Sequence, residues 1–138
     1  MATLGATLVR IAPGEVVLEF PFRPELTQQH GFIHAGIVTS VMDSACGYAA
    51  LSLMEAGVAV LSIEFKVNLL APARGARFRA TGRVVRAGRT VTVVAGELRV
   101  VEAADASRSA SSDEAGGALV AMMTATMMTV RDRPDLAD

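Results

Sequence analysis

A 19-residue stretch from Gly36 to Met54 consists mostly of Ile, Val, Ala, Leu and Met, and it constrains the fold more than any other part of the chain. Its length alone would allow it to cross a membrane. Asp43 lies near its centre, however, where a carboxylate costs about 2.5 to 3.5 kcal/mol on insertion scales, and no Lys or Arg flanks the stretch. We therefore expect a buried helix of a water-soluble protein, which other elements of the chain must cover.

The rest of the chain predicts strands that would cover this helix. Two segments around Pro13-Gly14 alternate apolar and polar residues and indicate a hairpin. Four more strand-like segments follow the helix, at intervals too short for crossover helices. These features predict an α+β fold, in which one antiparallel sheet curls around a single long helix. The six expected strands are Ala6–Ile11, Glu15–Phe22, Val58–Leu70, Arg77–Arg86, Thr90–Val101 and Ala118–Val130.

Length and composition limit the remaining possibilities. The 138 residues fit one domain, which we expect to span residues 1–138, with an exposed loop at Ala103–Gly117 and a frayed tail at Arg131–Asp138. The net charge of -1 gives no general attraction to nucleic acid or to an anionic membrane. The single cysteine, Cys46, cannot form an internal disulfide, and the N-terminus lacks the features of a secretory signal. We therefore expect a cytoplasmic location.

Asp43 is the first candidate for a catalytic residue. Burial of an unpaired carboxylate costs several kcal/mol, so such a group persists where a partner, a water or a chemical step uses it. The alternative is a structural carboxylate that accepts hydrogen bonds from backbone N–H groups. The two histidines and one cysteine form no cluster with metal-ligand spacing, and no phosphate-binding glycine loop is present, so we expect neither a metal nor a separate cofactor.

The segments His30–Val38 and Met42–Ala45 resemble the His-Gly-Gly and Asp-Ser/Thr-Ala signature of the PaaI-like acyl-CoA thioesterases, which belong to the hotdog superfamily. The spacing from His34 to Asp43 is the one that this family uses, and the segment Ile63–Pro72 is similar to its second strand. The likeness extends loosely from about Leu18 to Val130. It implies a hotdog fold and hydrolysis of an acyl-CoA to a free acid and coenzyme A.

The resemblance also implies an active site shared between two subunits. N–H groups at the start of the helix, near Gly36, would polarise the thioester carbonyl. Asp43 lies seven residues beyond Gly36, about 10 Å along a helix at 1.5 Å per residue, so it cannot reach a carbonyl held at its own helix start. The family resolves this with a homodimer, and we expect a homodimer or a dimer of dimers. Asp43 would act as general base or as nucleophile, and the sequence leaves both open.

Three more catalytic candidates follow from the same likeness. Gln28 stands where many relatives carry an Asn that holds the thioester carbonyl or the water. His34 matches the motif histidine, which orients the loop and the helix start, and Ser62 matches a Ser or Thr that positions the attacking water. His34 can equally be a loop residue, and Ser62 an ordinary strand serine.

Substrate-binding candidates carry over in the same way. The added methyl group of Ala35, where the family usually has Gly, could narrow the acyl entrance while its N–H can still donate. Basic groups should stand where the phosphates of coenzyme A bind, and Arg74, Arg86 and Arg89 are candidates for them. The full substrate-binding set is Ala35, Asn68, Arg86, Gly88 and Arg89. Two other functions remain open, a hotdog hydratase or dehydratase of acyl thioesters and a non-catalytic domain that binds acyl-CoA.

Overall fold

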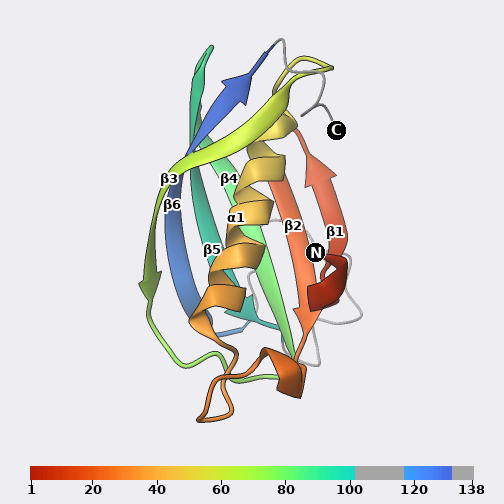
Figure 1. Cartoon of the computed structure of the whole chain (residues 1–138), viewed down its shortest axis with the longest axis vertical. Coiled ribbons are helices and arrows are strands. Elements are labelled where there is room, and N and C mark those ends of the chain that lie inside the picture. Colours follow the sequence, from red (N-terminus) through yellow and green to blue (C-terminus); the bar gives the residue numbers. More distant parts are fainter. Residues whose placement is uncertain (102–116, 132–138) are drawn as a thin grey trace.

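The computed structural model describes residues 1–101 and 117–131 of the chain. One long helix, α1 (Ala35–Leu51), lies against a six-stranded sheet (Figure 1). This arrangement confirms the α+β fold predicted from the sequence. The strands are β1 (Thr7–Ala12), β2 (Glu15–Pro21), β3 (Ala59–Leu69), β4 (Arg77–Ala87), β5 (Val91–Val100) and β6 (Leu119–Val130), and two short 3-10 helices are η1 (Ala2–Leu4) and η2 (Pro24–Leu26).

The predicted and observed boundaries of the six strands agree to within one residue at each end. The helix ends three residues earlier than Met54, because Ser52 closes it and turns follow. Almost all of the expected loop at Ala103–Gly117 and tail at Arg131–Asp138 lies outside the described residues. Among the helices of the described residues, none is long and apolar enough to span a membrane.

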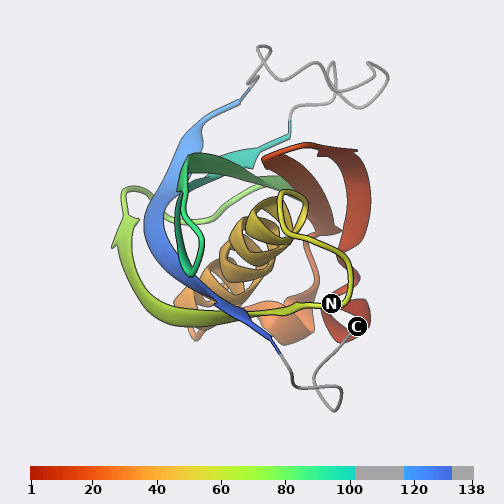
Figure 2. The same ribbon diagram turned by 90° about the horizontal axis from the view of Figure 1, so that it is seen from above.

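The order of the strands in the sheet is β1-β2-β4-β5-β6-β3, and every neighbouring pair is antiparallel. The strand that follows the helix, β3, therefore pairs with the last strand, β6, and forms one edge of the sheet. Viewed end-on, the sheet curls around α1 from β1 on one side to β3 on the other (Figure 2).

Two glycines allow α1 to approach the sheet closely. A Cβ atom at Gly82 of β4 would come within 2.5 Å of the Ala45 carbonyl oxygen, and one at Gly96 of β5 within 2.9 Å of Cys46 Sγ. Any larger residue at these positions would push the helix outward, because protein interiors are close-packed. The core around this contact contains fully buried side chains from α1 and from both neighbouring strands, including Met42, Val94 and Leu98.

The helix is not covered on all sides. The sheet buries one face of it, whereas Gly36, Ser40 and Tyr48 on the opposite face are exposed. The sequence predicted a helix covered on all sides, and this exposed face differs from that prediction. Most of its residues are small, and small residues tolerate contact with solvent as well as close packing against another element.

Candidate active site

The start of α1 is fixed by the side chain of His34. The imidazole Nδ1 accepts a hydrogen bond of 2.9 Å from the Gly36 backbone N–H, and the His34 carbonyl accepts from Ile37 and Val38 at 2.9 and 3.2 Å. His34 is therefore the N-cap of the helix. Because Nδ1 accepts, the neutral ring carries its proton on Nε2.

The first N–H of the helix, that of Ala35, has no acceptor among residues 1–101 and 117–131. The N–H of Gly36 is already bonded to His34. Of the two donors that the sequence suggested at the helix start, Ala35 is thus the one that remains available for a ligand. A free N–H at this place carries the positive end of the helix dipole and suits an oxygen that gains negative charge.

Gln28 lies in the turn that precedes the helix. Its side-chain oxygen accepts a 2.6 Å hydrogen bond from the backbone N–H of His30, and its backbone N–H and carbonyl are bonded to Phe32 and Gly31. Gly31 has φ +76°, a conformation that favours glycine and closes this turn. Because the amide oxygen is engaged, the NH₂ group of Gln28 is the end that can donate to a ligand.

A cavity of about 370 Å³ lies between the helix start and the end of β3. Gln28 and Ala35 both line it, and most of the remaining lining is apolar. The guanidinium of Arg74 stands 5.1 Å from the centre of the Phe32 ring, which is part of this lining. The apolar wall consists mainly of Phe32, Ile33, Val38, Leu69, Leu70 and Val120.

Asp43 pairs with Ser62 across the gap between α1 and β3. The Ser62 hydroxyl donates to Asp43 Oδ1 over 2.6 Å and also lies 3.3 Å from the sulfur of Met127. A hydroxyl has one proton, so the short contact to the carboxylate defines its direction. Asp43 is half-buried and does not line the cavity at the helix start.

A β-bulge makes the contact between Ser62 and Asp43 possible. The register with β6 shifts between Ser62 and Glu64, so Ile63 is an extra residue. In a regular strand Ser62 and Glu64 would lie on the same face. With the bulge, Ser62 faces the helix while Glu64 accepts a hydrogen bond from Thr126. Bulges are frequent next to active sites, where they redirect a side chain.

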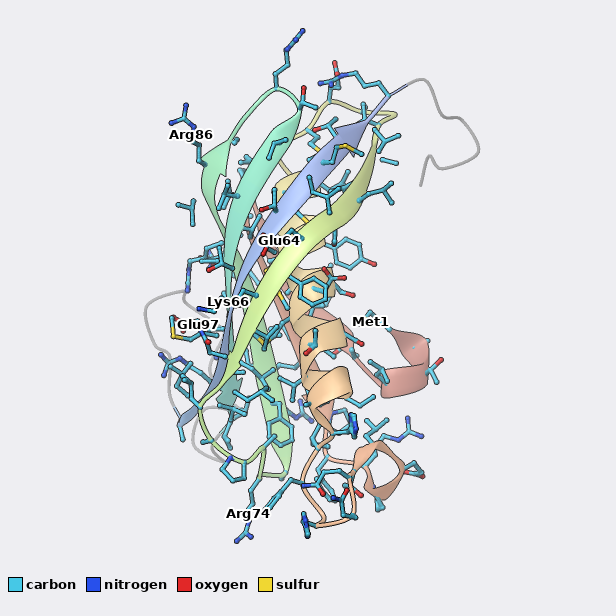
Figure 3. The ribbon with its side chains drawn as sticks, turned by 60° about the vertical axis from the view of Figure 1, so that its left-hand side comes forward. Met1, Glu64, Lys66, Arg74, Arg86 and Glu97 are labelled. Carbon is cyan, nitrogen blue, oxygen red and sulfur yellow. The ribbon has the colours of Figure 1, made fainter. Side chains whose placement is uncertain are left out.

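Three of the other substrate-binding candidates lie away from the helix start, whereas Asn68 precedes Leu69 of the cavity there. Arg86 lies near the end of β4, and Gly88 and Arg89 lie in the β4–β5 turn, at the end of the molecule where α1 terminates. Figure 3 shows Arg86 and Arg74 at opposite ends. Gly88 and Arg89 line a second cavity of about 250 Å³ there. Asn68 is exposed and pairs in register with Met122. Since Val67, its neighbour in β3, is turned toward the core, Asn68 faces away from the helix.

The thiol of Cys46 lies in the core one turn beyond Asp43. Burial, with a smaller contribution from the negative charge of Asp43, raises the pKa of this thiol from 9.0 to about 12. The thiol is therefore protonated and inert at neutral pH. In the part of the chain that the structure describes, no group of three or more His, Cys, Asp or Glu side chains could hold a metal ion.

Residues 30–107, more than half of the chain, match the family described as the Thioesterase superfamily. This chain belongs to the thioesterase superfamily. The match covers His34, which caps the helix start, and Asp43 and Ser62, which are bonded to each other. The fold and this membership confirm a PaaI-like hotdog protein.

Relatives of this thioesterase are similar along most of its length. A thioesterase family protein from Silicibacter pomeroyi has a structure with TM-score 0.83 and 48% identity, covering 94% of this chain and 88% of that one. Acyl-coenzyme A thioesterase 13 of Homo sapiens is 29% identical over 93 residues, 67% of this chain and 66% of the human protein. The PaaI protein of E. coli, from a phenylacetic acid degradation operon, shares the fold with TM-score 0.77 at 19% identity, covering 94% and 82%. The chain is accordingly a thioester hydrolase.

Sequence reasoning did not identify most of the lining of the cavity at the helix start. Phe32, Leu69 and Leu70 are apolar residues at the ends of a turn and a strand, and nothing in their local pattern separates them from core residues. The position of His34 directly before Ala35 could have indicated that Ala35, and not Gly36, carries the free N–H. A side chain at the N-cap bonds the second or third N–H of a helix and leaves the first one free.

Proposed function

We propose that this thioesterase hydrolyses an acyl-CoA to a free acid and coenzyme A, in an active site that two copies of the chain build together. The observation that carries the proposal is the separation of two half-sites on one chain. Ala35 and Gln28 supply donors at the helix start, whereas Asp43 lies eight residues farther along α1, about 12 Å at 1.5 Å per residue. Hydrolysis needs donors and carboxylate around the same carbonyl.

The edge of β3 supports an association of two copies. The outer side of this strand has no strand partner within the described residues. Apolar side chains on β3 and just after it are between 44% and 55% exposed, and an exposed apolar edge strand is a template for pairing with another chain. These side chains are Leu61, Ile63, Phe65, Leu69 and Leu70.

A two-fold axis beside β3 would join the two sheets and run the two copies of α1 antiparallel. The helix start of one subunit then faces the later turns of the partner helix. Asp43 of the partner subunit approaches the cavity lined by Ala35 and Gln28. The same operation creates a second, identical site.

In this arrangement the thioester carbonyl oxygen accepts hydrogen bonds from the Ala35 N–H and the Gln28 amide. As water or a carboxylate adds to the carbonyl carbon, the oxygen gains negative charge, which these donors stabilise. Ser62 holds Oδ1 of Asp43, and Oδ2 is left for the reaction. Asp43 either takes a proton from a water or attacks the carbon itself to form an anhydride that water opens. Coenzyme A leaves as a thiolate, which takes its proton from Asp43 in the first case and from water in the second. This chemistry requires no cofactor beyond the coenzyme A of the substrate.

Basic residues support coenzyme A as the carrier. Arg74 lies over Phe32 beside the cavity. In the proposed dimer, the antiparallel helices bring the end of one α1 next to the start of the other. The same end of the site as Arg74 therefore receives Arg86, Gly88 and Arg89 of the partner subunit. Guanidinium groups pair well with phosphates. The human relative that carries an acyl-coenzyme A thioesterase name agrees with this substrate.

Two inactive variants can test the shared site. Ala35→Pro removes the free N–H, and proline is tolerated at the first helical position when the preceding residue is extended, as His34 is at φ -63° and ψ 139°. Asp43→Asn removes the carboxylate charge. Each variant alone should lose on the order of 100-fold or more in kcat for acyl-CoA hydrolysis, followed by thiol release.

Mixed dimers of the two variants contain one complete site, formed by the donors of one subunit and the carboxylate of the other. After subunit exchange, the mixture should regain about a quarter of the native activity. Half of the dimers are then mixed, and one of the two sites in each mixed dimer is intact. Ala35→Gly, which keeps the N–H, is the matched control. A mixture as inactive as its parents would contradict the shared site, and a native protein that releases no thiol from any acyl-CoA would contradict the function.

A further inference from the structure

A second apolar groove lies on the other side of α1 from β3. It has a volume of about 350 Å³ and runs between the last turns of the helix and the N-terminal strands, which lie side by side in Figures 1 and 2. No charged side chain of the described residues lines it. Its walls include Leu8, Ile11, Leu18, Tyr48 and Leu51.

The walls of this groove are unusually exposed for apolar side chains. Leu8 is 57% exposed, Ile11 61% and Tyr48 44%, although Leu8 and Ile11 pair in register with the core-facing residues Leu18 and Val16. They therefore point toward the helix side of the sheet without being covered there. The polar atom of Ser52 is already engaged, because its hydroxyl donates to Ala49 and accepts from Gly14. The groove thus offers a mainly apolar surface, and the Tyr48 hydroxyl is the remaining side-chain hydrogen-bonding group among its lining residues.

A partly exposed side of α1 connects this groove with the carboxylate. Asp43, which bonds Ser62 on the β3 side of the helix, is followed at steps of four residues by Gly47 and by Leu51, which lines the groove. Each step of four residues turns about 40° around a helix with 3.6 residues per turn, so the three positions lead from the β3 side toward the groove. A Cβ atom at Gly47 would meet no atom of residues 1–101 and 117–131 within 4 Å. A ligand can therefore pass over Gly47 from Asp43 to the groove, a path of about 12 Å at 1.5 Å per residue.

We propose that this groove binds the distal part of a linear aliphatic acyl chain, and this rests on the proposed function. The carbonyl carbon stands at Asp43, the chain crosses Gly47, and its end lies between Leu51, Leu8 and Ile11. The volume holds roughly ten methylene groups if each takes about the share of a water molecule in the liquid, ~30 Å³. The phosphates of coenzyme A are poorly suited to this groove, because they would face mostly apolar walls with no Lys or Arg side chain among the lining residues.

The first test blocks the path. Gly47→Leu fills the partly exposed side of the helix between Asp43 and the groove, and it favours the helix, since leucine is a better helix former than glycine. The ratio of kcat/KM for decanoyl-CoA to that for acetyl-CoA should fall at least tenfold relative to the native protein. Ala95→Leu is the control, because it places the same side chain on the far face of the sheet and should leave the ratio unchanged. An unchanged ratio in Gly47→Leu, with acetyl-CoA and decanoyl-CoA still hydrolysed, overturns the groove and leaves the proposed function intact.

The second test needs no turnover. The chain contains no tryptophan, so Ile11→Trp introduces a single indole at an exposed wall of the groove. The probes are S-decyl-coenzyme A and S-ethyl-coenzyme A, thioethers that no hydrolase can cleave. Emission should shift to the blue with the decyl compound alone, as the indole loses water. A shift with both thioethers or with neither overturns the proposal, whereas a native protein that cleaves no acyl-CoA overturns the function on which it rests.

Discussion

The Ser62 hydroxyl donates a 2.6 Å hydrogen bond to Oδ1 of Asp43, a residue 19 positions earlier in the chain. A hydrogen bond to an ionised carboxylate is shorter and stronger than one between neutral groups, so it fixes the orientation of the carboxylate before substrate binds. Ser62 therefore acts through Asp43 in the proposed reaction. This relationship makes the two residues one functional unit, held by α1 and β3 together.

Substitutions in this pair should be strongly non-additive. We expect Asp43→Asn to reduce kcat by 100-fold or more, and Ser62→Ala to reduce it less, since the carboxylate remains but is no longer oriented. Ser62→Ala in the Asp43→Asn background should cost nothing further, because residues that act as a unit do not add. Steady-state kinetics of the four proteins would show this. If the double variant were slower by the product of the two single effects, the residues would act independently.

The cap of α1 gives a prediction about stability. His34→Ala removes the acceptor for the Gly36 N–H and should lower the free energy of unfolding by about 1 kcal/mol. His34→Asn supplies another side chain that caps helices well and should recover most of this loss. Urea unfolding followed by circular dichroism measures both values. Equal stability of the alanine variant and the native protein would mean that the imidazole does not hold the helix start.

The exposed edge of β3 predicts how the dimer can be broken. Phe65 is 46% exposed, and Phe65→Lys should yield a folded monomer, because a desolvated charge at the centre of an interface is costly. Val85→Lys is the control, since Val85 is 67% exposed on a different strand. Light scattering after gel filtration gives the mass of each variant, and thiol release gives its activity. A monomer that retained full activity would contradict the need for a partner subunit.

The strands were predictable to within a residue because alternation and turn signals such as Pro13-Gly14 are local. The order of the strands in the sheet was not predictable in this way, since the pairing of β3 with β6 joins residues about sixty positions apart. The site shows the same division. Asp43 and Ser62 could be named separately from the sequence, whereas their contact depends on the bulge at Ile63, which no local pattern indicates. The free donor at Ala35 likewise depends on where the His34 side chain bonds.

The buried thiol of Cys46 should make stability fall at high pH. Its pKa is about 12 in the folded chain and near 9.0 when the thiol is exposed, so above pH 9 the unfolded chain has released a proton that the folded chain still holds. The unfolded state then binds fewer protons, and the free energy of unfolding decreases as pH rises from about 9 to about 12, by at most about 1.4 kcal/mol per pH unit for this group.

Cys46→Ala should show a shallower decline over the same range, which urea unfolding at several pH values would reveal. The native protein should also resist a disulfide reagent such as Ellman's reagent at pH 8, and react with one equivalent after unfolding in urea. Rapid labelling of the folded protein would contradict the burial of the thiol. Parallel pH profiles of the native protein and Cys46→Ala would contradict the raised pKa, because the thiol is the group that distinguishes the two chains.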